Sequence, residues 1–337
     1  MTRFREHRTG GRGSALTWIV ALLAVVALIV SAALWYVREN ALAFYERSTR
    51  QALVKTGFEL RSLDGEAGRL FYWEAGEGST LVLLHGVGDQ AGAFQGVVGD
   101  LLGDYRIVIP DLPGHGASEP SEGPLPMTVV YRGVEELLES LESGGPLTLV
   151  GHSMGAWLAT VYAHRHPDRV ARVIAVNGGP LRGERTDLSL MPADREAART
   201  LMAALRDPAS EPTPNFVLDD IVEQAAKGPI GRMMAAWEDF EQYLLDDRLS
   251  EVPVPVDLVW GESDQLMTLD YAKRVADQLP RARITTIAAC GHHPANECPA
   301  ALAEKLGEVL SMEPPAPLDE GDGVVTPEGL ERLSEED

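Results

Sequence analysis

Ser153 lies at the centre of the pentapeptide Gly151 to Gly155, a G-x-S-x-G pattern that could present a nucleophile. The apolar run 147–150 predicts a strand before it, and the small and apolar residues after it are compatible with a helix, so the serine falls on the turn between them. Glycines two positions before and after the serine remove side chains that would collide with such a turn. A serine hydroxyl exposed there is suited to acyl transfer. A Gly-rich connection without chemistry is the alternative for this pattern taken alone.

Acyl transfer by a serine needs a base within hydrogen-bond reach and an acid that orients the base. Asp264 and His292 each follow a predicted strand and complete the chain order serine, acid, histidine. Asp111 is an alternative acid, but its Pro- and Gly-rich surroundings predict a turn in which the carboxylate caps backbone N–H groups. His293 is an alternative base, but the proline after it restricts it to an extended conformation. We therefore predict that Ser153, His292 and Asp264 act together.

The oxyanion formed during attack requires two preorganised donors. The candidates are the backbone N–H groups of Val87, in a Gly-rich loop after a strand, and Met154, directly after the nucleophile. Four further residues are candidate substrate-binding residues, the two histidines being held beside the site by packing: Trp237, Met234, His85 and His152.

Strand-like and helix-like segments alternate along the chain, which predicts a mostly parallel α/β sheet with the candidate residues at the carboxyl ends of its strands. We expect a hairpin over 58–63 and 70–73, then strands at 80–85, 105–109, 147–150, 170–176, 254–260 and 283–288. Helices are expected up to 102, over 127–141, after Ser153, over 268–278 and over 299–310. The catalytic core would comprise 57–179 and 251–311.

Residues 180–250 interrupt this alternation. Segments near 193–205, 216–226 and 231–245 have helical periodicity and are separated by prolines, which predicts a helical cap inserted between two strands. The cap contributes Met234 and Trp237 to the predicted substrate site.

The amino-terminal part of the chain predicts a membrane anchor. A basic segment, 1–15, precedes an apolar stretch, 16–37, that is long enough to span a hydrocarbon core of ~30 Å. A cleaved signal peptide is the alternative, although its apolar region would be unusually long. The dense arginines before the stretch favour a single-pass cell-membrane protein with its globular part on the extracytoplasmic side. Residues 38–56 would form a connector, amphipathic enough to lie on the membrane surface.

The formal net charge of -22 argues against a nucleic-acid partner. Much of this charge lies in 312–337, an acidic, Pro-containing segment that predicts a disordered tail. The two cysteines, Cys290 and Cys298, are close enough for one disulfide, and its formation depends on the compartment. A metal site is not expected, because its ligands would crowd the segment that carries His292.

Five motifs in sequence order together resemble the α/β-hydrolase superfamily. They are the His85 to Gly88 loop, D-x-x-G-x-G-x-S from Asp111, the serine pentapeptide, Gly261 to Asp264, and G-H-x-P-x-x-E-x-P from Gly291. The resemblance spans 58–310 and points to the lidded serine branch, which includes esterases, monoacylglycerol-type lipases and C–C bond hydrolases. It implies an α/β-hydrolase fold with an eight-stranded sheet whose second strand is antiparallel, a helical cap, and no cofactor.

These observations predict a membrane-anchored serine hydrolase of a hydrophobic carboxylic ester or similar acyl substrate. A C–C bond hydrolase is the enzymatic alternative, and it would need polar cap residues that recognise a dienoate; four arginines are candidates, Arg182, Arg195, Arg199 and Arg232. A non-catalytic membrane protein that uses the fold for binding is the second alternative.

Overall fold

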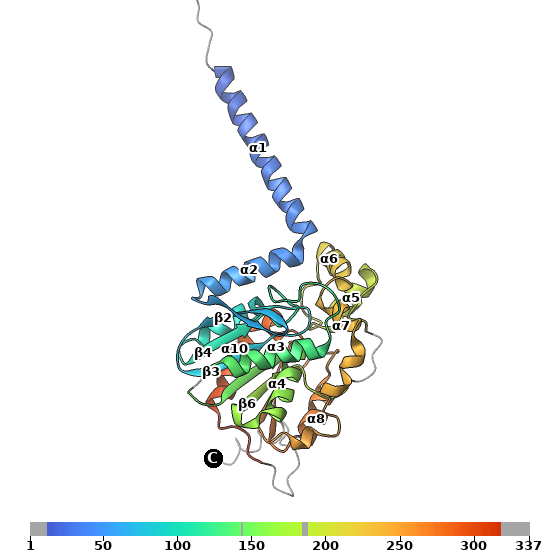
Figure 1. The fold of residues 1–337 in the computed structure, drawn as a ribbon. Coiled ribbons are helices and arrows are strands. Elements are labelled where there is room, and N and C mark those ends of the chain that lie inside the picture. Colours follow the sequence, from blue (N-terminus) through green and yellow to red (C-terminus); the bar gives the residue numbers. More distant parts are fainter. Residues whose placement is uncertain (1–11, 143, 184–187, 318–337) are drawn as a thin grey trace, which may run out of the picture.

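One eight-stranded sheet organises the molecule, which we describe from a computed structural model covering residues 12–142, 144–183 and 188–317 (Figure 1). The strands follow the order β1-β2-β4-β3-β5-β6-β7-β8. Their bounds are β1 Glu59–Gly65, β2 Gly68–Ala75, β3 Ser79–Leu84, β4 Tyr105–Pro110, β5 Leu147–His152, β6 Val170–Val176, β7 Val256–Gly261 and β8 Ala282–Ile287. Only β2 runs against its neighbours β1 and β4, and the remaining pairs are parallel. The predicted fold and the amino-terminal hairpin are confirmed.

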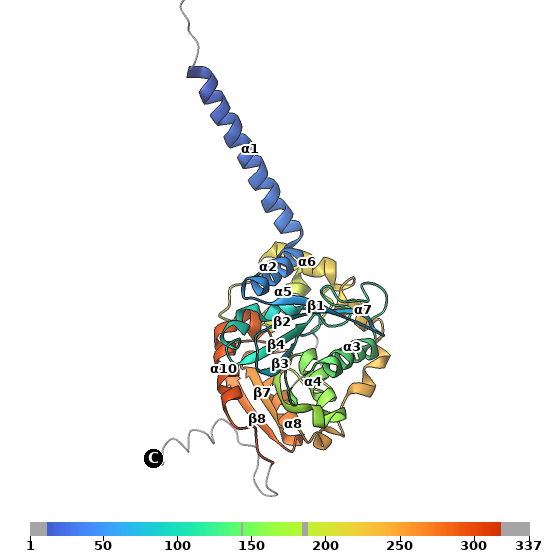
Figure 2. The ribbon, with the colours of Figure 1, turned by 60° about the vertical axis from the view of Figure 1, so that its left-hand side comes forward.

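Helices cover both faces of the sheet, so the central strands β3 to β7 are buried on both sides, as their continuous apolar runs require (Figure 2). The edge strand β1 is largely exposed. One apolar core lies between the sheet and α3 (Met127–Ser140), α4 (Met154–Arg165) and α8 (Leu269–Gln278). The other core lies between the sheet and α2 (Ala41–Lys55), α10 (Pro299–Ser311) and two 3₁₀ helices, η1 (Ala91–Gly96) and η2 (Val98–Asp100).

The prediction of one α-helix that ends near residue 102 is wrong. This segment forms η1 and η2 instead of one α-helix. Four glycines between residues 88 and 99 lower its helix propensity, and the buried side chain of Phe94 packs the short turns onto the sheet.

A helical cap lies between β6 and β7. It contains α5 (Arg195–Ala204), α6 (Asn215–Ala225) and α7 (Pro229–Met234), followed by the 3₁₀ turns η4 (Trp237–Asp239), η5 (Glu241–Tyr243) and η6 (Leu249–Glu251). The third predicted cap helix, 231–245, is therefore divided after Met234. Hydrogen bonds to α3 and α4 hold the segment 235–245, which contains η4 and η5. Asp239 accepts from the backbone N–H of Thr128 at 2.5 Å, and the Trp157 indole donates to the Tyr243 carbonyl at 2.6 Å.

Helix α1 (Arg12–Glu39) projects from the globular part (Figure 1). Within its segment Leu16–Glu39, the most apolar stretch of 18 residues has a mean hydropathy of 2.6, and none of that stretch is buried against the rest of the molecule. By length and composition alone this helix could cross a membrane, and a signal sequence near the amino terminus has the same properties.

The predicted connector is a helix that packs on the domain. Leu53 of α2 is fully buried in the second core, and the Arg50 guanidinium lies 3.2 Å from the carboxylate of Asp111. Asn40 alone separates α2 from α1. The globular unit therefore begins at Ala41 rather than at the predicted residue 57.

The first residues of the predicted tail also pack on the domain. Arginines of the sheet donate to backbone carbonyls of this segment: Arg172 to Met312 at 3.1 Å, and Arg281 to Pro315 at 3.0 Å. The rest of the predicted acidic tail, 318–337, and residues 1–11 of the basic segment lie outside the described residues.

Candidate active site

Ser153 occupies a sharp turn between β5 and α4, with a positive φ of 51° that is rare for a residue with a side chain. The flanking glycines are required by packing. A Cβ on Gly151 would overlap the backbone of Gly155, and a Cβ on Gly155 would overlap the carbonyl of Leu84 on β3. This close approach of α4 to the sheet holds the serine at the sheet edge.

The structure brings the three predicted side chains together in one chain of hydrogen bonds. His292 Nε2 lies 3.1 Å from Ser153 Oγ, and His292 Nδ1 lies 2.7 Å from Asp264 Oδ2. His292 and Asp264 are 2% and 4% exposed, so the ion pair formed by a protonated imidazole would be shielded from water. Because the carboxylate can only accept, Nδ1 carries the proton and the Nε2 lone pair faces the serine hydroxyl.

Asp264 is held from two sides. Its Oδ1 accepts backbone N–H bonds from Leu266 and Met267, both at 2.9 Å. Its Oδ2, which contacts His292, also accepts from the Asn177 side-chain amide at 2.7 Å, while Asn177 Oδ1 accepts from the Gly261 N–H at 3.1 Å. The carboxylate therefore has a fixed orientation toward the imidazole.

Asn177 was missed by our sequence analysis, although a signal is present. It follows β6, precedes two glycines and has a φ of 46°, a conformation that asparagine tolerates better than most residues. An asparagine at the carboxyl end of a strand neighbouring the acid strand is therefore a candidate for positioning the acid.

Replacing Asn177 with glycine is expected to lower kcat by roughly tenfold while KM changes little, because the carboxylate loses one orienting bond and glycine keeps the backbone conformation. Asn177→Ala should lower kcat similarly and also lower the Tm, because alanine is strained at this φ. Steady-state kinetics and thermal unfolding measure both effects. A glycine variant with wild-type kcat would exclude the positioning role.

The two candidate oxyanion donors lie beside the serine. Met154 is the first residue of α4, where helix N–H groups have no intrahelical partner, and Val87 lines the same cavity as Ser153. A Cβ added to Gly86 would come within 3.2 Å of the Ser153 Cβ, so the Val87 loop passes directly over the nucleophile.

A cavity of about 470 Å³ reaches from Ser153 and His292 to the cap and to α2. This volume lies in the range of small-molecule sites, ~300–1,000 Å³. Its walls are mainly apolar and include Leu42, Leu201, Leu205, Ile221, Ile230 and Leu266. The arrangement suits an apolar substrate whose reactive group lies at the serine.

Two of the predicted substrate-binding residues, Met234 and Trp237, do not line this cavity. They border a separate depression beside Pro126, where Trp237 is 51% exposed and its ring stacks on Phe240. The prediction assumed a continuous helix over 231–245, whereas α7 ends at Met234. Cap residues of α5 and α6 line the cavity instead.

His85 and His152 are buried structural residues, and neither lines the cavity. His85 Nδ1 bonds the carbonyl of Gly86 at 2.8 Å, and its Nε2 accepts from the Leu112 N–H at 3.0 Å. His152 Nε2 donates to the carbonyl of His292 at 2.7 Å. Both rings are buried beside the site and outside the cavity lining, so direct contact with substrate remains a prediction that the cavity geometry does not support.

Burial lowers the pKa of four imidazoles: to about 4 for His85, to about 3 for His152 and for His115, whose ring contacts that of His85, and well below 6.5 for His293. Below pH 6.5 these histidines bind protons in the unfolded chain but not in the folded chain, so stability present above pH 6.5 is lost as pH falls toward 4. Burial raises the pKa of Asp89 to about 7, which opposes this trend. We expect a net loss on the order of 5 kcal/mol between pH 7 and pH 5. Thermal unfolding at both pH values measures it, and an equal or higher Tm at pH 5 would contradict it.

The alternatives for acid and base are resolved by geometry. Asp111 accepts backbone N–H bonds from Ala91 and Ala117, both at 2.9 Å, so it caps a turn as predicted. His293 contacts the His292 ring edge-on, and its buried Nδ1 has no partner among the described residues.

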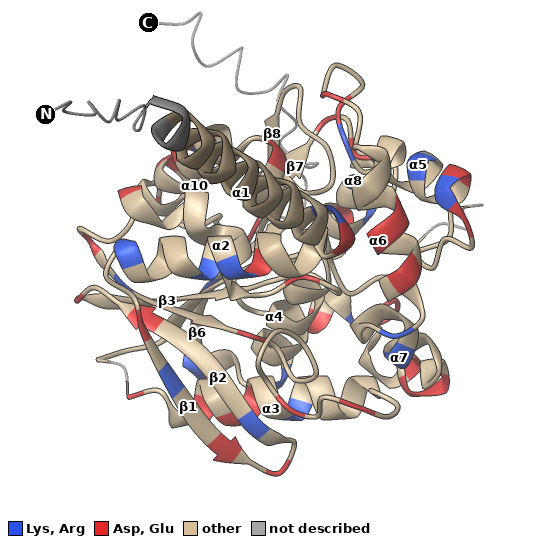
Figure 3. Cartoon of the chain, turned by 90° about the horizontal axis from the view of Figure 1, so that it is seen from above, with Lys and Arg blue, Asp and Glu red and all other residues tan. Residues whose placement is uncertain are grey.

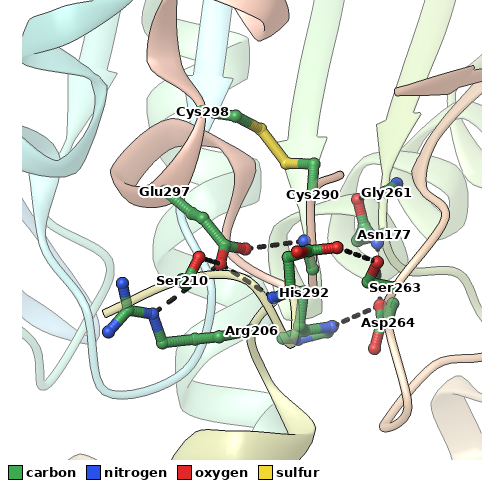
Figure 4. Close-up of a disulfide and its surroundings, with 12 residues drawn as sticks. Asn177, Arg206, Ser210, Gly261, Ser263, Asp264, Cys290, His292, Glu297 and Cys298 are labelled. Atoms are coloured by element: carbon green, nitrogen blue, oxygen red, sulfur yellow. Dashed lines mark hydrogen bonds and ion pairs between the residues drawn. A yellow bond between two sulfur atoms is a disulfide. The ribbon is translucent and has the colours of Figure 1, made fainter. Parts of the chain in front are cut away.

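A disulfide between Cys290 and Cys298 closes the loop that carries His292 (Figure 4). Within this loop, the Glu297 carboxylate accepts from the Gly291 N–H at 2.6 Å and from the Asp207 N–H at 2.8 Å. Asp207 follows cap helix α5, so Glu297 joins the cap to the histidine loop. Among the described residues, no group of three or more His, Cys, Asp or Glu side chains could hold a metal ion.

Comparisons with known proteins show the family of this chain. Residues 81–305 match the alpha/beta hydrolase family. An uncharacterized protein of Mycobacterium tuberculosis is 27% identical over 73% of this chain and 79% of its own length. A 2-hydroxy-6-oxononadienedioate/2-hydroxy-6-oxononatrienedioate hydrolase of Paraburkholderia phymatum is 29% identical over 66% of this chain and 84% of its own.

Two solved structures share the fold. A membrane phospholipase A, described as a bacterial virulence factor, superposes with a TM-score of 0.67 at 23% identity, over 89% of this chain and 98% of its own. The carboxylesterase CesB of Bacillus subtilis superposes with a TM-score of 0.60 at 18% identity, over 79% of this chain and 98% of its own.

Proposed function

Since this chain belongs to the alpha/beta hydrolase family, we propose that it cleaves a carboxylic ester or a similar acyl substrate through an acyl-enzyme on Ser153. The observation that carries the proposal is the hydrogen-bonded chain Ser153–His292–Asp264 at the end of an apolar cavity. Each member follows a different strand, so the sheet itself fixes their relative positions.

In the proposed reaction, His292 Nε2 takes the Ser153 proton as Oγ attacks the acyl carbon. The imidazolium is stabilised by Asp264 and then gives the proton to the leaving alcohol as the acyl–oxygen bond breaks. A water molecule, activated by the same nitrogen, attacks the acyl-enzyme and releases the acid. The N–H groups of Val87 and Met154 would stabilise the oxyanion in both steps, each such donor typically contributing ~3 kcal/mol.

We further propose that α1 anchors this enzyme in the cell membrane with the hydrolase domain on the extracytoplasmic side. The exposed apolar surface of α1 supports the anchor. The disulfide between Cys290 and Cys298 supports the extracytoplasmic location of the hydrolase domain, because disulfides persist in oxidising compartments.

The C–C bond hydrolase alternative is supported by relatives that carry that name. Recognition of a dienedioate would need cationic groups at the cavity. The four candidate arginines are engaged elsewhere: Arg182 with Glu241, Arg195 with Asp219, Arg199 with Glu196, and Arg232 with backbone carbonyls such as that of Gly123. None of these four lines the cavity. Arg206 does line it, but its guanidinium lies 3.7 Å from the Glu297 carboxylate and donates to the Glu211 carbonyl at 2.8 Å. Because this cation already has partners, ester hydrolysis is favoured.

A substrate panel tests the choice between these reactions. The full chain in detergent is expected to hydrolyse 4-nitrophenyl esters and to leave a 2-hydroxy-6-oxo-dienoate intact. Cleavage of the dienoate at a higher kcat/KM than every ester would replace the proposal with the C–C alternative. Hydrolysis of neither would favour a non-catalytic binding protein.

A further inference from the structure

Helix α2 has an outer face that no other described element covers. Its exposed side chains recur at intervals of three and four residues and so form one stripe: Phe44, Arg47, Gln51, Val54 and Lys55. Phe44 is 49% exposed and Val54 is 57% exposed. Large apolar side chains beside cations on one face are typical of a helix that lies in a membrane interface.

This outer face adjoins the point where α1 leaves the domain. Arg47 Nη1 donates to the Tyr36 hydroxyl of α1 at 3.0 Å, and Asn40 donates to the Tyr36 carbonyl at 3.0 Å. In Figure 3 the domain is viewed from the side of α1, and α2 lies next to α1 with its Lys and Arg positions in blue. A bilayer crossed by α1 is therefore the surface nearest to α2.

The inner side of α2 borders the active-site cavity. Leu42 lines the cavity, and its N–H donates to Asp220 of cap helix α6 at 2.8 Å. The Tyr45 hydroxyl donates to the Asn296 side chain of α9 (Pro294–Glu297) at 2.5 Å. Asn296 and Gln224 of α6 are exposed and line the cavity, so the cavity reaches the surface where α2, α6 and α9 meet.

We propose that the outer face of α2 rests in the bilayer interface and that the substrate is a membrane-resident acyl lipid, which enters the cavity between α2 and α6. This inference rests on the proposed ester hydrolysis. An acyl chain following this route would pass from lipid to Leu42 and then to Ile221 and Leu201, contacting apolar side chains along the way. Its transfer would then avoid exposing the chain to water.

The test compares a bilayer substrate with a soluble one on the same protein. Full-length enzyme is reconstituted in dioleoylphosphatidylcholine vesicles that carry monooleoylglycerol, and oleate release is measured beside hydrolysis of 4-nitrophenyl butyrate. The double variant Phe44→Glu, Val54→Glu should release oleate about tenfold more slowly than wild type, because two carboxylates oppose seating of the helix in the interface. Its rate of 4-nitrophenyl butyrate hydrolysis should stay within about twofold of the wild-type rate.

Met312→Glu is the matched control. Met312 is 46% exposed and belongs to the segment after α10, drawn red, which lies on the side of the domain away from α1 (Figure 1). Both rates should therefore equal those of wild type. Equal oleate release by the double variant and wild type would overturn the inference. Wild-type butyrate hydrolysis that depends on Ser153 but is accompanied by no oleate release would overturn it and leave the proposed function intact. Hydrolysis of neither substrate would overturn both.

A second readout does not depend on activity. Both native cysteines are joined in the disulfide, so a single introduced cysteine can be labelled selectively. On protein reconstituted in vesicles, the emission of an environment-sensitive dye at Gln51→Cys should be shifted to the blue relative to the free dye in buffer, and the same dye at Met312→Cys should show no such shift. No shift at Gln51→Cys, or equal shifts at both positions, would contradict the seating of α2.

Discussion

Ser153→Ala is expected to lower kcat for any ester substrate by roughly 10⁴–10⁶-fold, because the acyl-enzyme can no longer form. The substitution removes one oxygen atom from a residue whose backbone is fixed by the turn between β5 and α4. The fold should therefore remain, with a Tm close to that of wild type. Covalent labelling by a fluorophosphonate probe should disappear together with activity.

Ser140→Ala is a suitable control, because the Ser140 hydroxyl donates to the carbonyl of Leu137 within α3, at a distance from the candidate site. This variant should keep both labelling and turnover. Equal labelling of the Ser153→Ala protein and wild type would place the nucleophile elsewhere, and absence of labelling in wild type would contradict serine hydrolysis itself.

The second large effect concerns stability. Asp257 lies inside β7, is fully buried, and accepts from two arginines, from Arg172 Nε at 2.5 Å and from Arg283 Nε at 2.8 Å. Asp257→Ala would leave one buried and one half-buried guanidinium without its counter-charge. We expect a loss of about 3–5 kcal/mol in unfolding free energy, since breaking a buried ion pair from one side is strongly destabilising.

Thermal unfolding in detergent measures this loss, which corresponds to a decrease in Tm on the order of 10 °C for a domain of this size. Asp270→Ala is the matched control, because the Asp270–Lys273 pair on α8 is exposed and should contribute little. A Tm for Asp257→Ala within about 2 °C of the control would show that the arginines find other partners.

The reactive centre could be predicted from sequence because its determinants are local. Ser153, Asp264 and His292 each follow a strand whose apolar run is unmistakable, and parallel strands bring their carboxyl ends to one edge. The capping role of Asp111 was also readable, since the Gly- and Pro-rich turn around it limits what its carboxylate can reach.

The residues that line the substrate cavity could not be predicted in the same way. Which cap side chains line the cavity depends on where each helix ends and how it is rotated. Helix α7 ends at Met234, before Trp237, and Trp237 does not line the cavity. The contribution of Leu42 depends on α2 docking onto the sheet through Leu53 and Arg50, contacts between segments far apart in the chain. Neither fact leaves a periodic signal in the sequence.

Only one residue separates α1 from α2, so the connection between the membrane helix and the hydrolase domain is short. With α1 embedded, Ser153 would stay at a constant distance from the lipid head groups, and the enzyme would not diffuse through the surrounding solution. Turnover should then follow the mole fraction of substrate within its own leaflet. Diluting that leaflet with an inert ether lipid should slow the enzyme, whereas adding buffer should not.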